Sequence, residues 1–585
     1  MPRAEQQDNL ATRPEIAPDC AGLNFFDVDH SLRDLIPLYL GAEEQDVLTP
    51  HMQRLGALAG GRLDELARTA DRHPPVLHAR DRFGADEDYI EYHPAYREME
   101  QIAFGDFQFH AMSHRGGAFG MTKPVSPRAK YIFQYLFVQA EFGLMCPISV
   151  TDTSTHLIRK FADDQLKDLL LPRMLSADMA SLWKGTQFMT EQTGGSDVGT
   201  ITTTARKDGN AWRLSGDKWF CSHTDADVAL LLARPEGAPA GTRGLALFAM
   251  PRRLEDGGRN SYRIVRLKDK LGTRSMASGE IRMDGAFAWL VGDESAGLKQ
   301  MLEQVNLSRL SHGVRAAAMM RRCLNEAMVC ARSRRAFGEA IIDFPLLRRQ
   351  LAKLIVPTEQ SLSVMMAAAE ALDQSNGGSI EAKSLLRILT PLLKFRVCRD
   401  NVTVATGAME VRGGNGYIEE WVNARLVRDA HIGLLWEGTS NINALDIIAR
   451  AVGREGAHLT LAMALHRKLD ASTKLPDEFR NRVRQALDRA VDFAGRVAAL
   501  GGDEAMARQA ASGLYHATSA ALMAWEGCAS PKSGRRALLA RLVLERRLSP
   551  RDPLTPDPPF ERDAITLLLE DRPLTFEEVA PLLCS

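Results

Sequence analysis

The first third of the chain spaces its apolar residues as an α-helix does. Apolar positions recur at i, i+3 and i+4 in segments such as 31–40 (SLRDLIPLYL) and 129–145 (AKYIFQYLFVQAEFGLM), and prolines punctuate the pattern. Residues 1–22 are polar and lack this periodicity, so we expect a loose tail there. The pattern predicts helices from about residue 32 to residue 180.

The spacing changes near Gly185, where Thr, Val and aromatic residues begin to alternate with short turns. Residues 201–222 predict a hairpin with Asp208-Gly209 at its tip. Further short strands are expected at 227–235, 244–251, 262–267 and 279–287. So many short strands without intervening helices favour a small antiparallel barrel or sandwich.

Long helices return after Gly297. One is expected over 298–335, a second over 345–374 that ends at Asn376-Gly377-Gly378, and a third over 391–413. Three or four such helices imply a bundle. The chain is therefore expected to be mainly α with a central β-domain.

Four segments follow from these patterns. They are an N-terminal helical domain (1–185), a central β-domain (186–292), a C-terminal helical bundle (293–453) and an extra C-terminal helical domain (454–585).

Composition narrows the class of protein without identifying it. The 585 residues carry 73 Lys and Arg against 74 Asp and Glu, a balance that recruits neither nucleic acid nor an acidic membrane. The eight cysteines form no C-x-x-C pair, which fits a reducing cytoplasmic compartment. The sequence has no signal-peptide pattern and no apolar run of membrane-spanning length, and it suggests no metal site.

Two segments of the β-region carry candidate binding groups. In the loop FMTEQTGGSDVGT (188–200), paired glycines permit close backbone approach, and Thr190 and Ser196 offer hydroxyls. The strand KWFCSH (218–223) presents Phe220 and Ser222 on one face. The alternatives, a polar turn and a core strand, stay open for either segment alone.

The segment LLWEGTSNINALDIIARAV (434–452) carries the candidate base. A helix is expected to begin here with Thr439 or Ser440 as its N-cap. Glu437 lies just before the cap, beside Trp436, and a carboxylate in a partly apolar pocket has a raised pKa suited to a general base. The alternative is an ordinary glutamate in a first helical turn.

Two helix ends offer further contacts. Arg334 leaves a long helix before the turn Phe337-Gly338, where its guanidinium suits a pyrophosphate. Gly413-Gly414 ends another helix and admits a ligand or a partner chain. The alternatives are a solvated basic helix end and a plain C-cap.

In this order and spacing, the five motifs resemble those of the acyl-CoA dehydrogenase family. The matching segments are Thr190–Asp197, Phe220–Ser222, Arg334–Gly338, Gly413–Tyr417 and Trp436–Thr439. The resemblance implies an acyl-CoA dehydrogenase-like fold, FAD as cofactor, an acyl-CoA or related acyl substrate and a homotetramer. It leaves the electron acceptor unassigned.

The resemblance also assigns roles. Glu437 is implied to abstract the α-proton while the β-hydride passes to flavin N5, on short or branched acyl-CoA among other acyl donors. Some relatives carry the base at the position of Ser308, which cannot serve, and Arg309 is implied to lie near the substrate. The implied cofactor contacts are Gln187, Thr190, Ser196, Phe220, Cys221, Ser222, Arg334, Glu410, Gly414, Trp436, Gly438, Thr439 and Asn441.

Segments 89–96 (YIEYHPAY), 143–151 (GLMCPISVT) and 266–278 (RLKDKLGTRSMAS) more specifically resemble the AidB branch of this family, which extends the resemblance to about residues 20–550. This branch is associated with DNA binding. This suggests an alternative, a DNA-associated flavoprotein with little turnover. Asn306, Glu410 and Phe344-Pro345 depart from the usual substrate-site pattern. Residues 454–585 hold 19 basic and 18 acidic residues, with one local basic run that a solvated helix face also explains. The candidate nucleic-acid contacts in that run are Lys532, Arg535, Arg536, Arg541, Arg546 and Arg547.

Overall fold

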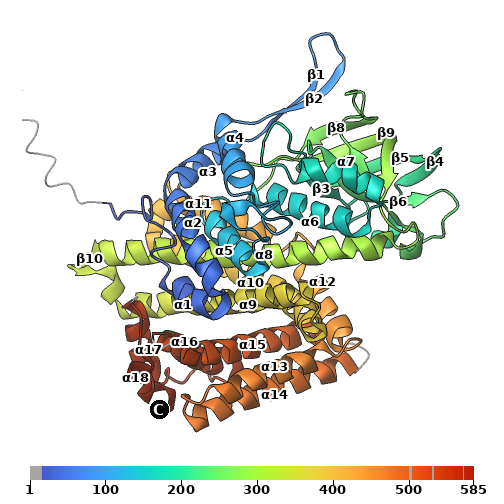
Figure 1. Ribbon diagram of the computed structural model, residues 1–585. Helices are drawn as coiled ribbons and strands as arrows, with labels where there is room; N and C mark the ends of the chain where they lie inside the picture. The colour runs from blue at the N-terminus through green and yellow to red at the C-terminus, as the bar shows by residue number, and fades with distance from the viewer. Residues whose placement is uncertain (1–15, 500–502, 530–531, 571, 585) are drawn as a thin grey trace, which may run out of the picture.

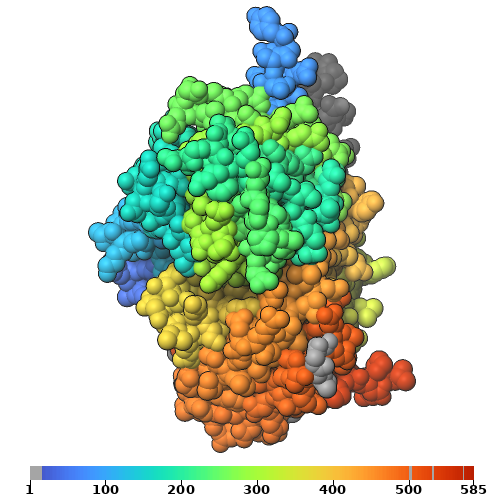
Figure 2. All heavy atoms as spheres, turned by 90° about the vertical axis from the view of Figure 1, so that its right-hand side faces the viewer, coloured from blue at the N-terminus to red at the C-terminus, as the bar shows by residue number. Residues whose placement is uncertain are grey.

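The computed structural model describes residues 16–499, 503–529, 532–570 and 572–584, stacked in three tiers (Figure 1). The β-domain lies above a layer of very long helices, and the C-terminal helices lie below that layer. The side view keeps this order and shows the hairpin of β1 (Val76–Arg80) and β2 (Asp86–Glu91) projecting from the top (Figure 2). None of the helices in these described ranges is long and apolar enough to cross a bilayer.

The N-terminal region is mainly helical, as expected. Its helices are α1 (His30–Tyr39), α2 (Ala42–Gly60), α3 (Arg62–Arg72), α4 (Pro94–Glu100), α5 (Pro127–Val138), α6 (Met145–Phe161) and α7 (Asp164–Met174). The expectation omitted one hairpin, formed by β1 (Val76–Arg80) and β2 (Asp86–Glu91). Most of its side chains are exposed, so it lacks the buried alternation that marks a strand in sequence.

The central sheet closes on itself. Its strands are β3 (Gly185–Phe188), β4 (Thr204–Asp208), β5 (Ala211–Ser222), β6 (Val228–Pro235), β7 (Ala246–Pro251), β8 (Tyr262–Leu267) and β9 (Ser278–Leu290). The order β3-β6-β4-β5-β9-β7, with β7 returning to β6, makes a barrel-like sheet. The β4–β5 hairpin is confirmed, with Asp208 paired to Ala211. The purely antiparallel prediction is wrong, because β6 pairs in parallel with both β3 and β4.

Three long helices form the middle layer. They are α8 (Gly297–Ser333), α9 (Pro345–Asn376) and α10 (Ile380–Arg412), followed by α11 (Val422–Ile432), α12 (Ser440–Leu445) and the π-helix η7 (Asp446–Val452). A short pairing of β10 (Arg335–Ala336) with β11 (Glu339–Ala340) links α8 to α9. The expected single helix from 298 to about 335 is confirmed.

The remaining helices cover the underside of this layer. They are α13 (Ala457–Ala471), α14 (Asp477–Ala499), α15 (Ala507–Ala529), α16 (Gly534–Val543), α17 (Pro559–Leu569), α18 (Phe576–Val579) and α19 (Pro581–Cys584). Helices α15, α16 and α17 all pack on α9, and the buried apolar residues of both tiers belong to one continuous core.

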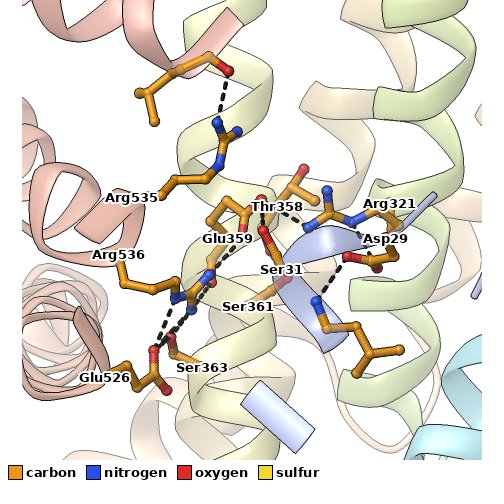
Figure 3. A network of polar contacts seen from close by, with 12 residues as sticks. Asp29, Ser31, Arg321, Thr358, Glu359, Ser361, Ser363, Glu526, Arg535 and Arg536 are labelled. Atoms are coloured by element: carbon orange, nitrogen blue, oxygen red, sulfur yellow. Dashed lines mark hydrogen bonds and ion pairs between the residues drawn. The ribbon is translucent and has the colours of Figure 1, made fainter. Parts of the chain in front are cut away.

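Charged pairs cross this boundary as well. Arg536 of α16 meets Glu359 of α9 and Glu526 of α15, while Glu359 also meets Arg321 of α8 (Figure 3). These side chains are all buried. The C-terminal helices are therefore fixed to the bundle by apolar packing and by a buried ionic network.

Candidate active site

Glu437 lies in a turn between α11 and α12 whose backbone is left-handed. Its φ is 55°, and Gly438 follows at φ 94°. A non-glycine residue in this region is strained, so the surrounding contacts must hold it there. A side chain at position 438 would approach Ile442 to 3.1 Å, so glycine also fits sterically.

Three side chains pin this turn through its carbonyl oxygens. Arg309 Nε of α8 donates to the Glu437 carbonyl at 3.1 Å. Lys394 Nζ of α10 and Asn443 Nδ2 of α12 donate to the Gly438 carbonyl at 2.6 and 2.8 Å. Arg309 is itself held by Asp446 at 2.8 Å. The bundle thus fixes the turn that carries the carboxyl group.

The electrostatic setting suits a base. Burial raises the pKa of the Glu437 carboxyl above its ordinary 4.5, and the cations Arg309, Lys394 and Arg315 oppose that rise. Burial also lowers the pKa of Lys394. A partly buried carboxylate with a raised pKa is a stronger base than a free one, and the nearby cations oppose part of that rise.

The β-domain contributes an anchored loop. Glu191 accepts hydrogen bonds from Lys218 Nζ at 2.9 Å and from the backbone N–H of Thr202 at 2.6 Å. Burial would raise the pKa of Glu191, but Lys218 and the neighbouring donors outweigh it and hold the pKa at about 2. The Trp219 N–H donates to the Thr190 carbonyl at 2.8 Å, which ties the loop to β5.

Most predicted cofactor contacts of the β-domain are accessible. Phe220 is 56% exposed on β5, and Gln187, Thr190, Ser196 and Ser222 are exposed or partly exposed. Cys221 is the exception: its thiol lies in the core, because alternate side chains of a strand face opposite sides. Its side chain therefore cannot line the site as expected.

Three observations test whether a flavin fits. The Gln187 Oε1 atom is buried without a hydrogen-bond partner, so an added donor would satisfy it. A side chain at Gly195 would approach Thr190 Oγ1 to 2.7 Å, so glycine keeps the loop open. An exposed aromatic ring at Phe220 supplies a flat contact. The residues present fit a planar ring system with hydrogen-bonding edges.

The predicted cofactor contacts around α12 agree in part with the structure. Trp436, Gly438 and Thr439 adjoin Glu437, and Thr439 is the N-cap residue of α12, although its side chain makes no capping hydrogen bond. Asn441 is exposed in the first turn of that helix. Sequence reasoning missed Lys394, whose one signal was a lone lysine in the apolar run PLLKFRV, and the Glu191–Lys218 pair, which left none.

Arg334 and Gly414 lie together in a different place from Glu437. With Arg335, Arg412 and neighbouring residues they line a hollow of about 660 Å³ at the end of α8. Arg334 lies 25 residues beyond Arg309 on one helix, or about 37 Å at ~1.5 Å per residue. Glu410 accepts a hydrogen bond from Gln350 at 2.9 Å. Arg334 is therefore too distant to share one ligand with Glu437 in the same chain.

The basic run of the C-terminal region does not form an exposed stripe, so that expectation is wrong for three of its residues. Arg535, Arg536 and Arg541 are at most 8% exposed. Arg546 pairs with Glu561 at 2.8 Å, while Lys532 and Arg547 reach the surface. Helix α16 is buried on all sides, and internal carboxylates and carbonyls receive its arginines.

Comparison with known proteins places these features in a family. Residues 16–179 match the adaptive response protein AidB N-terminal domain, 186–286 the acyl-CoA dehydrogenase middle domain, and 295–453 the acyl-CoA dehydrogenase C-terminal domain. The chain is 33% identical to the putative acyl-CoA dehydrogenase AidB of Escherichia coli K12, over 74% of this chain and 79% of that protein.

Two further relatives agree. Acyl-CoA dehydrogenase family member 11 of Caenorhabditis elegans is 31% identical over 79% of this chain and 76% of its own. The crystal structure of Caenorhabditis elegans ACDH-11 in complex with C11-CoA superposes with a TM-score of 0.84 at 28% identity, covering 92% of this chain and 94% of that one. The chain therefore belongs to the acyl-CoA dehydrogenase family, the FAD-dependent oxidoreductases that act on CH–CH groups.

Proposed function

We propose that this protein oxidises the Cα–Cβ bond of an acyl thioester, with Glu437 as the base. One observation carries the proposal: a desolvated carboxyl is held in a strained turn by Arg309, Lys394 and Asn443, next to cations that favour its ionised form. A carboxylate so placed is suited to taking a proton from a carbon acid.

The chemistry then divides between the chain and its cofactor. FAD, when bound, supplies the acceptor for the β-hydride. Glu437 takes the α-proton, so that a proton and a hydride leave and a C=C bond forms. Gln187, Thr190, Ser196, Phe220 and Ser222 would hold the flavin ring. The acceptor that reoxidises the flavin is left unassigned.

Ser308 supports the choice of base. It is buried on α8 one residue before Arg309, and a hydroxyl with a pKa far above neutral cannot take its place. The ACDH-11 structure contains C11-CoA, which makes CoA thioesters the first substrates to test.

The test is anaerobic titration of the FAD-loaded enzyme with acyl-CoAs of graded length, followed by bleaching of flavin absorbance. Glu437→Gln should slow bleaching by about 100-fold or more, the usual contribution of a general base. Glu303→Gln is the matched control, because Glu303 lies on the same bundle at the surface, paired with Lys160. Bleaching by Glu437→Gln at the wild-type rate would exclude Glu437 as the base.

We also propose that a second copy of the chain completes the cofactor site. The hollow at Arg334 and Gly414 lies about 37 Å along α8 from Arg309, so its cations suit a phosphate group of a neighbour's FAD, as in the expected homotetramer. Arg334→Ala should raise the dissociation constant of FAD without altering the pH profile of bleaching. Light scattering that finds only monomers would refute this assembly.

The alternative is a DNA-associated flavoprotein, and three of its six proposed contacts, Arg535, Arg536 and Arg541, are buried. Lys532 and Arg547 are the exposed members of that run. Duplex-DNA binding that falls steeply with salt would restore this alternative, because phosphate contacts release counterions.

A further inference from the structure

One face of α8 carries polar atoms that lack partners. Ser308, His312 and Arg315 follow each other at i, i+4 and i+7 and therefore share a face. Their side chains are at most 2% exposed. Ser308 Oγ, His312 Nδ1 and both Nε and Nη1 of Arg315 have no hydrogen-bond partner. Buried polar atoms normally are paired, so a row of orphans on one face indicates a site for a ligand.

This face points at the surroundings of Glu437. The His312 ring lies 5.2 Å from the Trp436 ring. The Arg315 guanidinium lies 5.8 Å from the Trp436 ring and 5.6 Å from the Phe142 ring. It also contacts the Cys146 thiol and interacts with the Glu437 carboxyl. Arg315 therefore borders the proposed active site from the bundle side.

Arg315 differs from several other buried arginines, which lie opposite carboxylates. Arg309 meets Asp446, Arg322 meets Asp64 and Glu326, and Arg536 meets Glu359 and Glu526. Arg315, at 1% exposure, has no ion pair among the residues that the structure describes. Burying a guanidinium without an ion pair is costly, and an incoming anion would recover part of that cost.

Glu437 is the carboxyl that interacts with Arg315, and the proposed reaction protonates it. Burial, reinforced by Arg315 and Lys394, lowers the pKa of His312 well below 6.5, so the imidazole is neutral. Lys394 adds a second cation, and Glu437 is the carboxyl that interacts with both. Once Glu437 has accepted a proton, two cations face no carboxylate. The pocket is thus electrostatically prepared for an anionic group besides the base.

We propose that Arg315 binds a carboxylate at the far end of the acyl chain, so that the substrate is a thioester of a dicarboxylic acid. This inference rests on the proposed function, because it assumes that the acyl chain lies beside Glu437. His312 and Ser308 would donate to the same carboxylate or to the chain leading to it. A purely apolar acyl chain would leave all three groups unsatisfied in a dry pocket.

The experiment compares binding of matched 3-thia acyl-CoA analogues of four to eight chain atoms, with and without a terminal carboxylate. These thioethers resist oxidation, so binding is read from the flavin spectrum without turnover. The wild-type holoenzyme should bind the carboxylate form at least ~30-fold more tightly at the best chain length, the effect of one desolvated charge pair. Arg315→Met should abolish this preference, and Arg315→Lys should keep part of it.

Arg349→Met is the matched control, because Arg349 pairs with Asp557 at the surface, and it should keep the full preference. Equal binding of both forms by the wild type, or a preference that survives Arg315→Met, would overturn the inference. If Arg315 only tunes Glu437, Arg315→Met will shift the pH profile of bleaching and leave the preference unchanged. A carboxylate preference without bleaching by any oxidisable thioester would sink the proposed function and spare this inference.

Should Arg315→Met fail to fold, Arg315→Gln and Arg315→Lys give the same comparison. The melting temperature is a further readout. Because Arg315 has no ion pair to lose, Arg315→Met should leave it unchanged or raise it, whereas a structural role predicts a fall.

Discussion

Removing Arg536 tests whether the C-terminal helices depend on the buried ionic network. Its guanidinium contacts Glu359 Oε2 at 2.5 Å and Glu526 Oε2 at 3.0 Å, and it also donates to Ser363 Oγ (Figure 3). The arginine side chain is 2% exposed and both carboxylates are fully buried. The perturbation Arg536→Met keeps much of the side-chain volume and deletes the charge.

Arg536→Met leaves Glu359 with more of its partners than Glu526. Glu359 keeps Arg321 at 2.8 Å and the Ser31 hydroxyl at 2.9 Å. Glu526 keeps two hydroxyl donors, Tyr39 at 3.0 Å and Ser363 at 2.5 Å, and no cation in the network. Leaving one buried charge without its partner typically costs about 3–5 kcal/mol. We therefore expect the free energy of unfolding to fall by about 3 kcal/mol at pH 7.

The loss should depend on pH. Arg321 and then Arg536 outweigh the effect of burial and hold the pKa of Glu359 at about 2, below its ordinary 4.5. A depressed carboxyl pKa stabilises the fold above the unfolded value and loses that contribution as pH falls from about 4.5 toward 2. The difference between wild type and Arg536→Met should therefore shrink over that window.

Urea unfolding followed by circular dichroism measures the effect. Adding Glu526→Gln to Arg536→Met removes the orphaned charge and should recover part of the loss. Arg572→Met is the control, since Arg572 pairs with Glu578 at 44% exposure and should cost under about 1 kcal/mol. If Arg536→Met costs no more than this control, the network does not stabilise the contact between the tiers.

Three further predictions concern titration and reactivity. The rate of flavin bleaching should rise with pH through a pKa above 4.5. Lys394→Met should move that midpoint higher, because Lys394 counteracts the rise in the pKa of Glu437 that burial causes. An unmoved midpoint in stopped-flow measurements contradicts this. Burial and nearby Asp71 raise the pKa of Asp429 to about 7, so the wild type loses stability as pH rises from 3.8 toward 7. Asp429→Asn should therefore raise the melting temperature more at pH 8 than at pH 5, and equal shifts would refute this. Ellman's reagent should label one thiol in a fast phase, the exposed Cys584. Cys584→Ser should remove this fast phase, and its persistence would show another reactive cysteine.

Much of the fold could be predicted from the sequence, because helices and hairpins leave local patterns in the spacing of apolar and turn residues. The hairpin tip at Asp208-Gly209, the long helix α8 and the stop at Asn376-Gly377-Gly378 all followed from spacing and turn residues. The resemblance of the EGT segment to the family's motif pointed to Glu437 as the candidate base, whereas the cations around it, Arg309, Arg315 and Lys394, come from other helices. The parallel pairings of β6 did not follow, since its partners on β3 and β4 are distant in sequence and spacing does not reveal them.

The tertiary structure decided what surrounds each charge. Periodicity tells which residues share a face of a helix, but not what covers that face. In sequence the arginines of α16 resemble a solvated stripe. In the structure Glu359, 177 residues away, lies opposite Arg536. In sequence Arg315 resembles any helix arginine, but the packing of α8 against Trp436 and Phe142 buries it without an ion pair. The sequence by itself predicted most helices and strands and offered Glu437 as the candidate base, whereas only packing determined which charges are paired, because pairing depends on residues that folding brings together.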